Sequence, residues 1–99
     1  METYDLKVEP FTRFDEPKAQ ALKPLEEAAE VFGAWQASGI DGAVSITPEM
    51  REDIVYECLD VIQSCVNLMD SIGTTDAELR DAARKVYASN VERGRYEPC

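Results

Sequence analysis

Two stretches carry the helical pattern of this chain: residues 22–36, LKPLEEAAEVFGAWQ, and residues 50–69, MREDIVYECLDVIQSCVNLM. Each stretch contains two acidic residues three positions apart, namely Glu27 and Glu30 in the first and Glu57 and Asp60 in the second. That spacing places both carboxylates of a pair on one side of a helix. If the two helices pack antiparallel, four carboxylates converge, and carboxylate oxygens are the ligands that Mg²⁺ prefers. The alternative interpretation is two solvated acidic helix faces.

The helical periodicity places some of these acids beside apolar surface. At about 100° per residue, Leu25 and Phe32 lie away from Glu27 on the first helix. On the second helix Glu57 borders an apolar stripe that consists of Ile54, Cys58, Val61, Cys65, Leu68 and Ile72. A carboxylate at the edge of a core needs a partner, because burying it unpaired is costly. Ten Lys and Arg residues stand against twenty Asp and Glu residues, so a metal ion is the expected partner.

The pattern predicts an all-α fold, a helical bundle of three to four helices that oligomerisation completes. Residues 1–17 hold two prolines and alternate apolar residues, which favours an extended N-terminal arm packed on the body or on a partner. Residues 18–99 form the expected single domain. The apolar arc of the second helix is wider than one partner helix covers, which favours a homodimer or homotetramer.

Helix boundaries follow from capping signals. The first helix is expected over about residues 17–37, with a kink or break near Pro24. Thr47 followed by proline predicts the start of the second helix, which runs to about Ser71 and stops at a glycine. Thr75 and Glu78 form a capping box for the third helix, whose apolar stripe ends in polar residues before a C-cap at Gly94. The connection over 38–47 is either a surface loop or a wall of a pocket.

Composition narrows the function classes. The net charge of −10 over 99 residues excludes binding of a nucleic-acid backbone by bulk electrostatics. Three cysteines give no disulfide framework, and Cys58 and Cys65 are expected as small core residues. No apolar run approaches the roughly 20 residues of a membrane span, and no signal-peptide pattern opens the chain. A cytoplasmic location is the resulting expectation.

The order of the acidic motifs resembles a known family. Glu27-x-x-Glu30, 26 intervening residues and Glu57-x-x-Asp60 look like the divided ExxE…ExxD signature of the MazG-like nucleotide pyrophosphohydrolases, the all-α NTP pyrophosphatase superfamily. Residues 23–30 (KPLEEAAE) resemble the first metal helix of that family, and residues 90–96 (NVERGRY) resemble its closing motif.

The resemblance implies an Mg²⁺-dependent enzyme, with Mn²⁺ as an alternative, that cleaves a nucleoside triphosphate substrate to a nucleoside monophosphate and pyrophosphate. The implied role is the cleaning of the nucleotide pool, and the four acids are implied as metal ligands and catalytic residues. The candidates for phosphate, sugar and base contacts are Lys23, Lys85, Asn90, Arg93, Arg95 and Trp35. Lys85 stands five positions before Asn90, where the family usually has four, and core packing is the better interpretation of Trp35.

Two other functions fit part of the pattern. A non-enzymatic acidic helical module that binds another protein explains the charge and the apolar surplus, but not acids at a core border on two separate helices. A family member that binds nucleotide without turnover is disfavoured, because all four acids are present.

Overall fold

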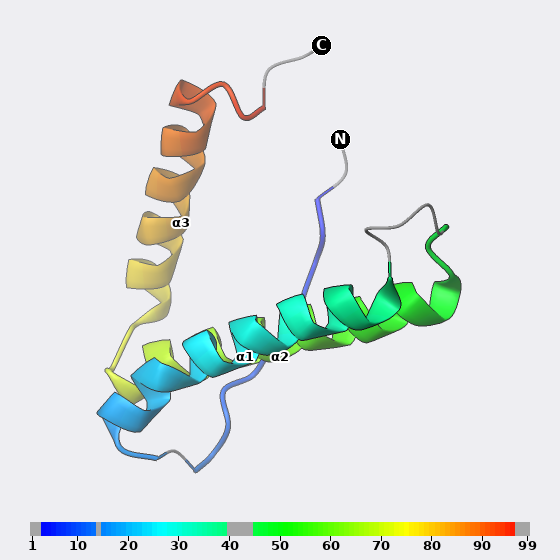
Figure 1. Cartoon of the computed structure of the whole chain (residues 1–99). Helices are drawn as coiled ribbons and strands as arrows, with labels where there is room; N and C mark the ends of the chain where they lie inside the picture. Colours follow the sequence, from blue (N-terminus) through cyan, green and yellow to red (C-terminus); the bar gives the residue numbers. More distant parts are fainter. Residues whose placement is uncertain (1–2, 14, 40–44, 97–99) are drawn as a thin grey trace.

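The computed structural model describes residues 3–13, 15–39 and 45–96. Within these ranges there is no strand, and the chain forms the three helices α1 (Pro17–Ser38), α2 (Pro48–Ser71) and α3 (Asp76–Glu92). The all-α prediction is therefore confirmed. Figure 1 shows α1 and α2 side by side in antiparallel directions, with α3 leaving the end of α2 at a steep angle.

Helix α1 runs through Pro24, so of the expected kink or break the break is wrong. Pro24 has no N–H to donate to the carbonyl of Gln20. The helix nevertheless continues, because α1 packs along α2 and this tertiary contact outweighs the lost bond. At its other end Gly39 adopts a φ of 71°, and its N–H donates to Gln36 O at 3.2 Å. Glycine takes that left-handed conformation without steric cost, which explains the helix end.

Helix α2 begins as its sequence predicts. The Thr47 hydroxyl accepts a hydrogen bond from Met50 N at 3.2 Å, and Pro48 occupies the first helical position. Glu49 in the first turn complements the positive end of the helix dipole. Gly73, with a φ of 81°, follows the end of the helix as expected.

Helix α3 begins with the predicted capping box. Thr75 N donates to Glu78 Oε1 at 2.9 Å, and Glu78 N donates to Thr75 Oγ1 at 3.2 Å. These hydrogen bonds with Thr75 lower the pKa of Glu78, because they favour its charged form. Exposed ion pairs of Arg80 with Asp76 and of Lys85 with Asp81 support the helix surface.

The N-terminal arm, residues 3–13, has no regular secondary structure and lies against α2. Phe11 N donates to Asn67 Oδ1 at 2.9 Å, and Gln63 Nε2 donates to Glu9 O at 2.8 Å. Gln63 Nε2 also donates to Asn67 Oδ1 at 3.0 Å, which orients the two amide side chains together. The arm is thus held on the body through backbone groups that two buried or half-buried side chains recognise.

One chain leaves most of its apolar surface uncovered. Among the described residues no apolar side chain is buried, and α3 packs on neither of the other two helices. The radius of gyration is 16.2 Å, whereas a compact domain of about 100 residues has roughly 13 Å. Cys65 is half-buried but Cys58 is exposed, so the expected core position of Cys58 is wrong within a single chain. Within a single chain, the other described residues do not cover Cys58.

Part of the connection between α1 and α2, and one of the three cysteines, fall on residues that the structure does not describe. Residues 40–44, most of the connection that was expected as a loop or pocket wall, lie outside the described residues, as does Cys99. Within the described chain, no helix has both the length and the hydrophobicity to cross a lipid bilayer.

Candidate metal centre

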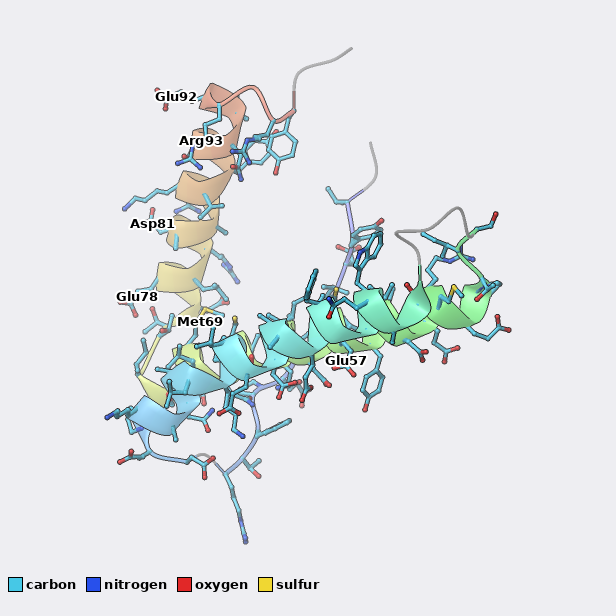
Figure 2. All side chains as sticks on the ribbon, in the orientation of Figure 1. Glu57, Met69, Glu78, Asp81, Glu92 and Arg93 are labelled. Carbon is cyan, nitrogen blue, oxygen red and sulfur yellow. The ribbon has the colours of Figure 1, made fainter. Side chains whose placement is uncertain are left out.

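The antiparallel packing of α1 and α2 brings the four predicted acids together. One carboxylate oxygen from each residue lies within 4.8 Å of the corresponding oxygen of every other, and the residues are Glu27, Glu30, Glu57 and Asp60. The spacing of three within each helix puts two acids on the side that faces the other helix. Figure 2 shows Glu57 on the paired helices. We call these four residues the acidic cluster.

The acidic cluster is partly withdrawn from water. Glu27, Glu57 and Asp60 are half-buried, while Glu30 is exposed. The Oε2 atom of Glu57 is buried and has no hydrogen-bond partner among the described residues. A buried carboxylate oxygen without a donor is costly, because water has been removed and nothing replaces it. Binding of a cation or of a proton at this oxygen would therefore remove the cost of burying it.

Two glutamates of the acidic cluster have raised pKa values, because they are partly buried beside other negative charges. Burial raises the pKa of Glu57 above its ordinary value of 4.5, and the negative charges of Glu30 and Asp60 raise it further. Burial also raises the pKa of Glu27, with the charge of Glu30 as the next cause. Both shifts mean that the ionised cluster is unfavourable on its own.

Protein cations do not neutralise the cluster. The ion pairs of the described chain join Lys23 to Glu26 and connect side chains within α3, and none includes an acid of the cluster. Four oxygen donors on two rigid helices fit a hard divalent cation such as Mg²⁺ or Mn²⁺, which completes its shell with water or substrate oxygens. The residues present therefore suit a divalent cation better than any side chain within reach.

Two cavities of different character flank the cluster. The first, which we call the arm cavity, has a volume of about 380 Å³ and includes Glu27 and Asp60 in its wall. Its other lining residues are Phe11, Arg13, Asp15, Gln20, Lys23, Gln63, Ser64 and Asn67. The second, which we call the tyrosine cavity, has a volume of about 350 Å³ and is lined by Ala34, Ala37, Ser38, Met50, Asp53, Tyr56 and Glu57.

Most of the substrate-contact candidates do not meet the cluster within one chain. Lys23 lines the arm cavity beside Glu27. The candidates Lys85, Asn90, Arg93 and Arg95 belong to α3 or follow it, and α3 packs on neither α1 nor α2. Figure 2 shows Arg93 at the far end of α3 from Glu57. Their contact with substrate remains a prediction.

Trp35 lies on α1, is half-buried and lines neither of these two cavities. Whether Trp35 serves packing or base stacking stays a prediction. Glu26, next to the cluster in sequence, is exposed and pairs with Lys23 at 3.5 Å, as expected of a surface residue.

Sequence reasoning missed the polar wall of the arm cavity. Gln20, Ser64 and Asn67 are the buried polar residues of the described chain, and all three line this cavity. A signal was available, because Gln63, Ser64 and Asn67 interrupt the apolar residues of α2, and Ser64 and Asn67 have a spacing of three. Polar side chains on a helix face that packs inward usually meet a partner or a ligand.

No family model, no curated protein and no solved structure matches this chain.

Proposed function

We propose that this protein is a divalent-cation-dependent nucleoside triphosphate pyrophosphohydrolase. The observation that carries the proposal is the acidic cluster, four carboxylates from two antiparallel helices whose oxygens lie within 4.8 Å of one another. The buried Glu57 oxygen, which has no hydrogen-bond partner among the described residues, supports this proposal. Acids that serve only the fold would be expected to have hydrogen-bond donors for their buried oxygens. The specific reaction comes from the resemblance of the ExxE…ExxD order to the MazG-like enzymes.

The residues of the chain have distinct roles in this reaction. Glu27, Glu57 and Asp60 are half-buried and suited to hold the cation, which is Mg²⁺ or Mn²⁺. When bound, that cation supplies polarisation of phosphoryl oxygens and a lower pKa for a coordinated water. Glu30 is the exposed member of the cluster and is suited to accept the proton of the attacking water.

The bond changes balance without a further reactant. The oxygen of water forms a bond to phosphorus, and the phosphoanhydride bond between the α- and β-phosphates breaks. Pyrophosphate leaves with the electron pair of the broken bond, and the proton of water passes to a carboxylate of the cluster. The products are a nucleoside monophosphate and pyrophosphate. Such a reaction would serve to remove unwanted nucleotides from the pool.

A substrate screen tests the proposal. The purified 99-residue chain is incubated with a panel of nucleoside and deoxynucleoside triphosphates, and pyrophosphate and orthophosphate are measured separately. We expect pyrophosphate from at least one nucleotide with Mg²⁺ or Mn²⁺, and at least 100-fold less in the presence of a chelator, because the cation neutralises the developing charge. Release that does not depend on a divalent cation, or release of orthophosphate instead, would overturn the proposed reaction.

One observation favours a second function, a module that binds another protein. Large apolar side chains are exposed on all three helices, including Phe32, Val55 and Val86. Such surfaces mark interaction sites. This function needs no divalent cation, so a protein that takes up no Mn²⁺ and cleaves no nucleotide would favour it.

A further inference from the structure

We propose that the N-terminal arm builds the phosphate side of the substrate site, with Arg13 and Lys23 binding the anionic oxygens that the metal centre leaves free. The proposal rests on the proposed function, because it assigns one end of the same substrate to the arm cavity. Arg13 lies outside the ExxE…ExxD motifs and the closing motif, whereas Lys23 opens the stretch that resembles the first metal helix and is already a candidate for substrate contact.

The arm cavity is lined by buried polar side chains and not by surface residues alone. Its wall contains Gln20, Ser64 and Asn67, which are 5%, 6% and 5% exposed. Two of these side chains hold the main chain on either side of Arg13. Asn67 Oδ1 accepts from Phe11 N at 2.9 Å, and Gln20 Oε1 accepts from Asp15 N at 3.1 Å. Arg13 is therefore carried by a segment that is anchored before and after it.

The cavity is continuous with the acidic cluster. Glu27 and Asp60 belong to both, one from each helix of the pair. A ligand in the cavity therefore lies beside two of the four acids of the cluster. The cavity volume of about 380 Å³ lies within the range of small-molecule sites, which is roughly 300–1,000 Å³.

Charge distinguishes the two cavities beside the cluster. The arm cavity carries Arg13 and Lys23 in its wall, beside the carboxylates of Asp15, Glu27 and Asp60. Among its described lining residues the tyrosine cavity has no Lys or Arg, and Asp53 adds a further negative charge there. A polyphosphate chain beside four carboxylates needs both a divalent cation and fixed positive groups, so it belongs in the arm cavity. The tyrosine cavity offers Tyr56 and Met50 to the uncharged end of the substrate.

Both cations are able to reach a ligand. Arg13 is exposed at the cavity wall, and its guanidinium presents a fork of donors that suits phosphate oxygens. Lys23 pairs with Glu26 at 3.5 Å across an exposed surface, and such pairs contribute little and exchange partners readily. A bound polyphosphate would take Lys23 from Glu26 at small cost.

The test measures binding of inorganic tripolyphosphate with Mg²⁺ by calorimetry, together with the KM for the best nucleotide of the screen. The variants are Arg13→Gln and Lys23→Gln, and the matched control is Arg51→Gln, which removes one exposed positive charge from α2. Direct uptake of Mn²⁺ by each protein shows whether the acidic cluster is intact. All three positions are surface-exposed or half-buried, so folding is retained and circular dichroism checks it.

We expect Arg13→Gln and Lys23→Gln each to weaken tripolyphosphate binding and to raise KM about tenfold, since a charge-assisted contact to phosphate is lost. Uptake of Mn²⁺ stays within twofold of wild type in both, and Arg51→Gln changes none of the three readouts. If wild type cleaves nucleotide while both variants match it in tripolyphosphate binding and KM, the phosphate-side assignment is wrong and the proposed function stands. If wild type takes up no Mn²⁺, both are wrong.

Discussion

Replacing Glu30 by Gln abolishes most of the pyrophosphate release that we expect of the wild-type protein, by roughly 10²–10⁴-fold in kcat, the range associated with loss of a general base. Glu30 is the exposed acid of the cluster, and its oxygen lies within 4.8 Å of oxygens of the other three. The substitution keeps the size of the side chain but removes its charge and its ability to take a proton. A continuous assay of pyrophosphate measures the effect.

The matched control is Glu52→Gln, which also removes one carboxylate. Glu52 is exposed on α2 and stands five positions before Glu57, so it lies roughly 140° around the helix from that residue. We expect its activity within twofold of wild type. Equal activity in Glu30→Gln and wild type would remove Glu30 from the mechanism, whereas equal loss in both variants would show an effect of net charge alone.

Replacing Phe32 by Glu dissociates the oligomer that we expect this chain to form. Phe32 is 58% exposed on α1, and Leu25, two turns earlier on the same side, is 70% exposed. A chain without a buried apolar side chain in its described part has no conventional core, so a second copy is the expected cover. Burial of a Phe side chain contributes about 1.5–3 kcal/mol, so its loss in each copy raises the dissociation constant at least roughly 100-fold.

Sedimentation measures this change against the chain mass of 11.1 kDa. Wild type should sediment as a dimer or tetramer, and Phe32→Glu should shift towards the single chain. Ala88→Glu is the control, because it adds the same charge at an exposed position on α3, nine residues beyond Leu79 and so opposite that residue on the helix. A wild-type protein that stays monomeric at high concentration would contradict the expectation.

The local signals in the sequence predicted the helices well. Thr47 with Pro48, and Thr75 with Glu78, satisfy backbone groups at a helix start through contacts within four residues, and both are present in the structure. Such signals do not depend on the remainder of the fold, which is why they are readable from a single sequence. The helix has no break at Pro24, because the cost of that proline is local while the packing that outweighs it is tertiary.

The acidic cluster was predictable in part, because it also depends on a local pattern in the sequence. A spacing of three fixes which side of a helix carries Glu27 and Glu30, so the cluster followed once the two helices were taken as antiparallel. The arm cavity was not predictable, because it depends on hydrogen bonds such as Phe11 to Asn67, which lie 56 residues apart. The separation of α3 from the other helices likewise reflects missing tertiary contacts that no local pattern reports.

The raised pKa values of Glu27 and Glu57 set the direction of the pH dependence. A carboxyl group whose pKa is higher in the folded state stabilises the fold below its unfolded value of 4.5, and this contribution is lost as the pH rises through the higher folded value. Without a divalent cation, the acidic cluster therefore destabilises the fold at neutral pH. Protons compete with the cation for the same oxygens, so cation binding weakens on acidification.

Calorimetric titration of Mn²⁺ into the metal-free protein tests the central claim most directly, since it asks whether the acidic cluster holds a divalent cation. We predict saturable uptake at pH 7 that weakens at least tenfold at pH 5 and at least tenfold in Glu57→Gln at pH 7, while Glu52→Gln keeps the wild-type affinity. Wild-type protein that shows no saturable uptake at pH 7, or that loses no affinity when Glu57 is replaced, would contradict the account.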